Sequence, residues 1–269
     1  MDEKEQVPIP GWSTEISDVG FHKINIRGYP LKDIIRNLTF TEVVYLTMKG
    51  ELPPKNHARV LDAILCGIVD HGFFAPTGIA TRVVASANPG NIIPGVVGGL
   101  LTVGSVTISP QDTAVLILEA WKIKEDQDIS KEETAEKIVD EALINKRRIP
   151  GLGHPLHPTG DPRAIALQEV AKRYGIWGER SELYMEIHRT FIRKTGKELP
   201  INIDGMMGCV LTEMGFDPRE MAGIAALSYM PGIISHAVEE TRERPRLRAV
   251  DGEYKGVPAR ELPLEYQRE

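Results

Sequence analysis

Helix start and stop signals recur along most of this chain, and they constrain its fold more than any other feature. Thr39 with Glu42, and Ser130 with Glu133, have the spacing of capping boxes ahead of apolar runs of helical period. Proline, glycine and capping residues predict the remaining helices, over Val60–Val69, Ser109–Trp121, Ser130–Asn145, Asp161–Gly175, Ser181–Gly196, Asp217–Met230 (before an interruption at Pro231) and Gly232–Arg242.

Strand signals are confined to the N-terminal region. Residues Lys23–Arg27 alternate between polar and apolar side chains, and Asp18–Gly20 could form the turn of a small hairpin. A doubly wound sheet or a TIM barrel would need strands and helices in alternation, and no such alternation follows. The sequence therefore predicts an all-α fold with a small N-terminal hairpin.

Composition and charge exclude several classes of protein. The chain has 269 residues, 42% of them hydrophobic, and a net charge of −6, so neither disorder nor general binding to nucleic acid or anionic lipid is expected. The uncharged run Val83–Gln111 is long enough to span a bilayer. Asn88, Pro89, Asn91 and Pro94 interrupt it, which favours buried protein over a membrane segment.

Two further features bear on the compartment. Cys66 and Cys209 lie far apart and belong to no metal-type or redox-type cluster. Residues 1–10 are acidic and lack the apolar segment of a signal peptide. A reducing, cytoplasmic setting is expected.

The stretch Ile149–Pro158 is the most informative for chemistry. Its glycines and prolines predict an irregular loop whose backbone N–H groups can meet a ligand, with His154 at its edge and Arg163 one turn into the next helix. That arrangement suits an anionic, partly flat ligand, although a plain connection with surface histidines fits the spacing too. His154 and His157 are disfavoured as metal ligands, because a proline follows each and no third ligand is evident.

Each of three other stretches has two possible interpretations. Asp204, flanked by Ile203 and Met206, is either a carboxyl group of raised pKa or a helix N-cap. His71 is expected at a helix C-terminus, either as a cation that holds a carboxylate or as a cap. The basic cluster Glu243–Arg248 is either a solvated face or a clamp for carboxylate or phosphate.

Taken in order, these stretches resemble the citrate synthase superfamily. A phosphate-binding lysine loop, a dinucleotide fingerprint, a serine elbow and paired zinc cysteines are all missing from the sequence. The compact length resembles that of citryl-CoA lyase and of the citrate-synthase-like module of ATP-citrate lyase. The resemblance extends from Gly11 to Gly256 and is carried by Arg27–Tyr29, Phe40–Pro53, Asp70–Pro89, Pro150–His154, Asp161–Arg163, Asn202–Gly205 and Arg244–Arg248.

The resemblance implies an all-α homodimer, or a higher oligomer of dimers, in which two helical parts close over the substrate. The larger part would comprise approximately residues 1–110 and 210–269, and the smaller part approximately residues 111–209. It implies a small-molecule acyl-CoA substrate, no metal and no permanently bound cofactor. Neither nucleic acid nor a membrane is an expected partner.

The resemblance also assigns roles to residues. The one that matches His154 contacts the carbonyl or hydroxyl oxygen at the reacting carbon, and the one that matches Asp204 exchanges a proton with the acetyl carbon. The matches to His71, Arg163 and Arg244 hold substrate carboxylates, the last across the subunit boundary. Coenzyme A would lie against Pro150, Gly151, Leu152 and Gly153.

Three departures from the family pattern bear on the reaction. Thr107 stands where citrate synthases have a histidine that donates to the thioester oxygen, and lyase relatives lack that histidine too. Pro155 replaces an arginine, and Tyr229, counted as a substrate-binding position, replaces a carboxylate-binding arginine. The resulting hypothesis is a citryl-CoA lyase that releases acetyl-CoA and oxaloacetate. The alternatives are a citramalyl-CoA lyase, a condensing enzyme of the citrate synthase type, or a non-catalytic acyl-CoA-binding homologue.

Overall fold

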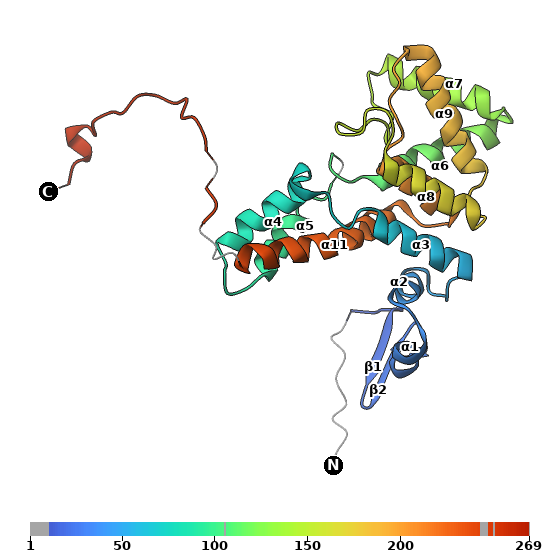
Figure 1. The fold of residues 1–269 in the computed structure, drawn as a ribbon, viewed down its shortest axis with the longest axis horizontal. Coiled ribbons are helices and arrows are strands. Elements are labelled where there is room, and N and C mark those ends of the chain that lie inside the picture. Colours follow the sequence, from blue (N-terminus) through green and yellow to red (C-terminus); the bar gives the residue numbers. More distant parts are fainter. Residues whose placement is uncertain (1–10, 105, 243–246, 250, 269) are drawn as a thin grey trace.

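The computed structural model describes residues 11–104, 106–242, 247–249 and 251–268. Within them the chain forms eleven α-helices, two short 3₁₀-helices and a three-stranded sheet, so the predicted all-α class with a small sheet is confirmed (Figure 1). The elements are β1 Ser17–Gly20, β2 Lys23–Ile26, β3 Tyr29–Pro30, α1 Leu31–Asn37, α2 Phe40–Lys49, α3 Lys55–Gly67, η1 Gly72–Phe74, α4 Pro76–Ser86, α5 Ile93–Leu100, α6 Pro110–Gln127, α7 Lys131–Ile144, α8 Pro162–Arg173, α9 Glu179–Thr195, α10 Ile203–Glu213, α11 Pro218–Arg242 and η2 Leu264–Tyr266.

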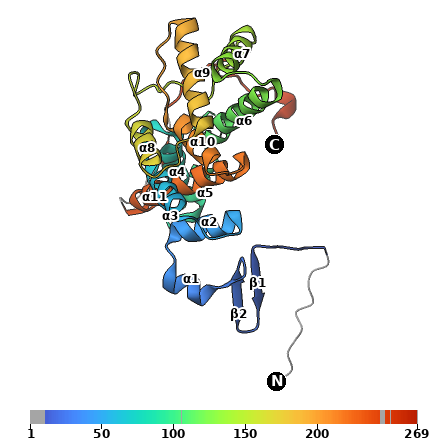
Figure 2. The ribbon, with the colours of Figure 1, turned by 90° about the vertical axis from the view of Figure 1, so that its right-hand side faces the viewer.

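The N-terminal sheet is antiparallel, in the order β1-β2-β3. Asp18 pairs with Asn25 inside the ladder, so the predicted turn at Asp18–Gly20 is wrong by a few residues. The turn lies at Phe21–His22, where His22 has a φ of 57°. The sheet and α1 lie at one end of the molecule, below α2 in Figures 1 and 2.

Both predicted capping boxes are present. The Thr39 hydroxyl accepts from the Glu42 N–H while the Glu42 carboxylate accepts from the Thr39 N–H, and Ser130 and Glu133 repeat the pattern. Each box satisfies two N–H groups that a helix start otherwise leaves unpaired. The predicted end of the helix at Trp121 is wrong, because α6 continues to Gln127.

The last long helix is continuous, which corrects the predicted interruption at Pro231. Pro231 has no N–H for the helical ladder, and the neighbouring Gly232 N–H donates outside the helix, to the Val69 carbonyl at 3.0 Å. A Cβ at position 232 would lie 2.2 Å from that oxygen, so only glycine permits this approach. The segment after α3 is thereby fixed against α11.

The core is continuous and centres on α10, which packs against α6, α8 and α9. Met207 and Leu211 of α10 are fully buried, and each contributes about 1.5–3 kcal/mol of hydrophobic free energy. Helices α6, α7 and α9 gather at one end, while α4, α5 and α11 pack together in the middle (Figures 1 and 2). α10 therefore connects α8 to α6 and α9 beside the site described below.

One helix of the described residues, α11, is long and apolar enough to cross a membrane. It packs against α3, α4, α5 and α6 and contributes buried residues such as Met221 and Ile224 to the core. The uncharged run Val83–Gln111 is divided among α4, α5 and the start of α6.

Candidate active site

A pocket of about 300 Å³ brings together residues that lie far apart in the sequence. It opens between the segment after α3, the segment before α6, the loop before α8 and the first turn of α10. Of the described residues predicted to contact substrate or catalyse the reaction, all five lie on its wall: His71, His154, Arg163, Asp204 and Tyr229.

The glycine-rich loop is hydrogen-bonded to the segment that leads into α10. The Gly153 N–H donates to the Pro200 carbonyl at 2.7 Å, and the Asn202 N–H donates to the Gly151 carbonyl at 2.9 Å. The Asn202 side-chain amide donates to the Gly153 carbonyl at 2.9 Å. The Gly153 N–H is therefore used within the protein, and the prediction that backbone N–H groups of this loop meet a ligand concerns the other residues of the loop.

Gly151 allows the loop to lie directly on α10. Its φ is +79°, and a Cβ there would lie 2.4 Å from the Cα of Gly205. The neighbouring Pro150 carbonyl accepts a hydrogen bond from the buried Tyr184 hydroxyl at 2.6 Å. Pro150 and Gly151 therefore hold the loop in place, whereas Leu152 and Gly153 face a second, larger groove.

Arg163 is oriented by Asp161, the residue predicted to begin its helix. Asp161 is fully buried and caps α8, and its carboxylate accepts from the Arg163 Nε at 3.0 Å and Nη2 at 2.8 Å. It also accepts from the Ile203 N–H at 3.0 Å, which ties α8 to α10. Burial alone would raise the pKa of Asp161, but the hydrogen bonds and charge of Arg163 lower it.

Asp204 is not the N-cap of its helix. Asn202 caps α10 by accepting from the Gly205 N–H at 3.0 Å, so the Asp204 carboxyl group faces the pocket instead. Burial raises the pKa of Asp204 to about 6, against a smaller opposing effect of a hydrogen bond from the Ser109 backbone. Of the two interpretations of Asp204, the structure favours the carboxyl group of raised pKa.

His154 faces hydrogen-bond donors at both ring nitrogens. Its Nδ1 accepts from the Leu156 N–H at 3.1 Å, and its Nε2 lies 3.2 Å from the Arg163 Nη2. Burial, and then the Arg163 charge, lower its pKa. The imidazole is therefore held neutral near pH 7, in the form that can accept a proton.

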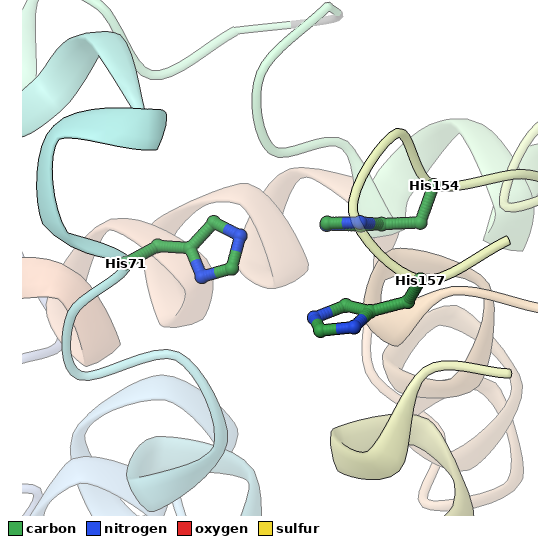
Figure 3. Close-up of side chains that lie close together, drawn as sticks. All are labelled: His71, His154 and His157. Atoms are coloured by element: carbon green, nitrogen blue, oxygen red, sulfur yellow. The ribbon is translucent and has the colours of Figure 1, made fainter.

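His71 lies four residues beyond the end of α3, at the start of η1, rather than at a helix C-terminus as predicted. Burial lowers its pKa, and the Arg163 charge lowers it further, so the expected cation is not favoured. Its Nε2 is buried without a hydrogen-bond partner among the described residues. His157 lies beside these groups, with its ring stacked on that of His154 (Figure 3).

The three departures from the family pattern all lie at this pocket. Thr107 and Pro155 line it, and so does Tyr229, which is 4% exposed. Burial raises the pKa of Tyr229 to about 12, although the Arg163 charge opposes the rise, so the phenol stays neutral. Arg244 lies outside the described residues.

A second groove, of about 740 Å³, shares Gly153, His154 and Pro155 with the first pocket. Its wall combines apolar side chains such as Phe191 and Leu199 with a group of cations. Sequence reasoning missed this group, although the run NKRR directly before the loop was a visible signal. The cations are Lys146, Arg147, Arg148 and Lys197.

The chain is similar to known proteins over most of its length. The family model described as the citrate synthase C-terminal domain matches residues 53–249. Citrate synthase 2 of Bacillus subtilis is 28% identical over 195 residues, which are 72% of this chain and 50% of that protein. The chain spans about half the length of the curated relatives it matches.

Solved structures of known proteins share the fold. Citryl-CoA lyase from Hydrogenobacter thermophilus superposes with a TM-score of 0.86 at 35% identity, over 94% of this chain and 98% of that one. ATP citrate lyase from Methanothrix soehngenii, solved with citrate and coenzyme A, has a TM-score of 0.74 at 21% identity, over 96% of this chain and 43% of that one.

Proposed function

The chain belongs to the citrate synthase family, and from this premise we propose that it is a carbon–carbon lyase that cleaves citryl-CoA to acetyl-CoA and oxaloacetate. One observation carries the proposal. A neutral imidazole, His154, and a carboxyl group of raised pKa, Asp204, face the same pocket beside the Arg163 cation.

The cleavage needs one proton removed and one delivered. His154 takes the proton of the tertiary hydroxyl group, and the bond between the hydroxyl-bearing carbon and the thioester methylene breaks. Asp204, in its protonated form, then delivers a proton to the carbon of the thioester enolate. General acid and base steps of this kind contribute about 10²- to 10⁴-fold each.

Arg163 and His71 hold the carboxylates of the substrate. Arg163 is already fixed by Asp161, so its guanidinium is presented to the pocket without further ordering. Arg244, supplied by the partner in a homodimer, completes the set in this proposal. The helical parts, approximately residues 1–110 with 210–269 and residues 111–209, close over the substrate.

The second groove holds the coenzyme A portion of the substrate. It joins the pocket at Gly153 and His154, so a thioester placed there reaches the reacting groups. Its cations suit phosphate groups, and its apolar wall suits the pantetheine arm and the adenine ring. Leu152 and Gly153 provide the contact expected of the glycine-rich loop.

Two observations favour cleavage over condensation. Thr107 lines the pocket where citrate synthases have a hydrogen-bonding histidine, which weakens activation of acetyl-CoA by that route. The fold also superposes along nearly its full length on a protein named citryl-CoA lyase. Curated relatives that match the chain are named citrate synthase, so condensation is the alternative.

Tyr229 supports a second candidate, cleavage of citramalyl-CoA to acetyl-CoA and pyruvate. Its neutral phenol offers no cation to a second carboxylate of the 2-oxo acid, and the wall of the same pocket includes the apolar side chains of Ile68 and Phe74. A methyl group fits such a wall better than a carboxylate does.

Product identification by mass spectrometry tests both candidates. The protein is incubated in turn with citryl-CoA, with citramalyl-CoA, and with acetyl-CoA plus each free 2-oxo acid. Acetyl-CoA with oxaloacetate supports the first proposal, and acetyl-CoA with pyruvate supports the second. Efficient condensation with slow cleavage would contradict both, and equal inactivity of the parent and Asp204→Asn variant on every substrate would indicate a non-catalytic homologue.

A further inference from the structure

We propose that His71, His154 and His157 together bind one transition-metal cation at the mouth of the pocket. The sequence disfavoured a metal because no third ligand was evident beside His154 and His157. The fold supplies that ligand, since it places His71 opposite the loop that carries the other two histidines (Figure 3).

The geometry suits a single ion. One ring nitrogen from each histidine lies within 4.8 Å of the other two. The rings of His154 and His157 are stacked at 4.6 Å, and both point toward His71, whose ring centroid is 5.4 Å from that of His154. Metal–nitrogen bonds of about 2.0–2.1 Å require nitrogens somewhat closer than this, a difference that side-chain rotation covers.

His71 supplies the second observation. Its Nε2 is buried and has no hydrogen-bond partner in the described part of the chain. Buried side-chain nitrogens nearly always have a partner, so this nitrogen is suited to a ligand from outside the protein.

The surrounding charges tolerate a dication. Arg163 opposes it, because its Nη2 lies 3.2 Å from the His154 Nε2. Asp161 offsets that charge with two hydrogen bonds to the same guanidinium, and Asp70 adds a carboxylate next to His71. The site therefore has no net positive charge from these groups.

The donor set selects the class of metal. Three imidazoles suit Zn²⁺, Co²⁺, Ni²⁺ or Cu²⁺, whereas Mg²⁺ and Ca²⁺ require oxygen ligands. Three protein ligands leave a fourth position for water or another ligand. One consequence rests on the proposed function. The ion and the organic substrate compete for His71 and His154, so the metal inhibits cleavage.

The test measures binding directly, on the full chain without an affinity tag and after treatment with a chelator. Co²⁺ is titrated and followed by its visible spectrum, and Zn²⁺ is titrated by calorimetry. The parent protein is expected to bind one ion per chain. Loss of a second-sphere partner weakens metal binding about 10- to 100-fold, so loss of a ligand in His157→Asn should weaken it at least about tenfold.

The matched control is His22→Asn, which removes an exposed histidine from the distant N-terminal hairpin and should leave binding unchanged. A parent protein that binds neither ion, or equal weakening in the two variants, would overturn the proposal. With each variant's rate measured relative to its own metal-free rate, inhibition by Zn²⁺ should be lost in His157→Asn and kept in His22→Asn. If no variant cleaves any thioester, the proposed function fails while the Co²⁺ titration still decides the metal site.

Discussion

Two aspartates at neighbouring helix starts have pKa values that are shifted in opposite directions. Asp161 begins α8 and Asp204 lies in the first turn of α10, and a hydrogen bond from the Ile203 N–H to Asp161 joins the two starts. The pKa of Asp161 is lowered, whereas that of Asp204 is raised to about 6. Burial disfavours the charge of both, so the difference comes from the partner: Arg163 forms two side-chain hydrogen bonds with Asp161.

The comparison distinguishes an aspartate that positions a neighbouring side chain from an aspartate that can transfer a proton. Asp161 stays ionised and fixes the Arg163 guanidinium. Asp204 can hold a proton near neutral pH and faces the pocket.

The largest effect is expected for Asp204→Asn, which keeps the size of the side chain and removes its titratable proton. Cleavage should fall by about 10²- to 10⁴-fold, measured as kcat on the thioester that the parent cleaves. The control is Asp126→Asn, an exposed position in α6, which should keep full activity. A loss below tenfold would contradict the proton-donor role.

The same variant should be more stable than the parent above pH 6. A folded pKa of about 6, against an ordinary aspartate pKa of 3.8, means that ionisation of Asp204 costs the folded state up to about 3 kcal/mol at pH 8. The cost appears as the pH rises from 4 through 6, so the gain in Tm of Asp204→Asn should shrink toward pH 4. A Tm below that of the parent at pH 8 would contradict the assignment.

Asp161→Asn should have the opposite effect on stability. It leaves the Arg163 guanidinium without its buried carboxylate, at a cost of about 2–3 kcal/mol. Because the pKa of Asp161 is lowered in the fold, its contribution is present above about pH 4 and is lost as the pH falls below that. With Arg163 less well oriented, KM should rise about tenfold with a smaller change in kcat. Denaturant unfolding at pH 7 and at pH 3.5 checks the first effect, and steady-state kinetics check the second.

The pH dependence of cleavage should reflect Asp204. The donor must be protonated, so kcat/KM should fall by about tenfold per pH unit above about pH 6. His154 must be neutral, and its lowered pKa keeps it so over this range. A profile that rises from pH 6 to pH 8 would contradict these assignments.

The smallest effect is expected at the rim of the second groove. Arg148→Ala removes one exposed cation and should raise KM for the thioester about two- to fivefold without changing kcat. Arg36→Ala, an exposed arginine in α1, is the matched control. The increase should diminish as salt is added, because screening weakens such contacts.

Local signals in the sequence were enough to predict most helices. The capping boxes at Thr39 and Ser130 depend on residues three positions apart, and both were found. The continuity of α11 was missed because it depends on packing against other helices and on contacts such as that of Gly232 with Val69, 163 positions away, which no local pattern identifies.

The candidate site also has some features that local sequence predicts and others that depend on the fold. His154, Arg163 and Asp204 could be named from their surroundings in the sequence and from a resemblance, and the structure brings them to one pocket. The ion pair between Asp161 and Arg163 joins residues only two positions apart, but its burial depends on the packing of α8 against α10. The three-histidine cluster depends on the position of the segment after α3. The burial and the cluster both required the fold.

The central claim is that His154 and Asp204 move protons at opposite ends of one carbon–carbon bond. The most direct test is cleavage of citryl-CoA in D₂O, with mass analysis of the acetyl-CoA released. The account predicts acetyl-CoA with one deuterium in its methyl group, released with oxaloacetate by the parent protein and not by Asp204→Asn. Release of free coenzyme A and citrate instead, or the same deuterated product at the same rate from both proteins, would contradict it.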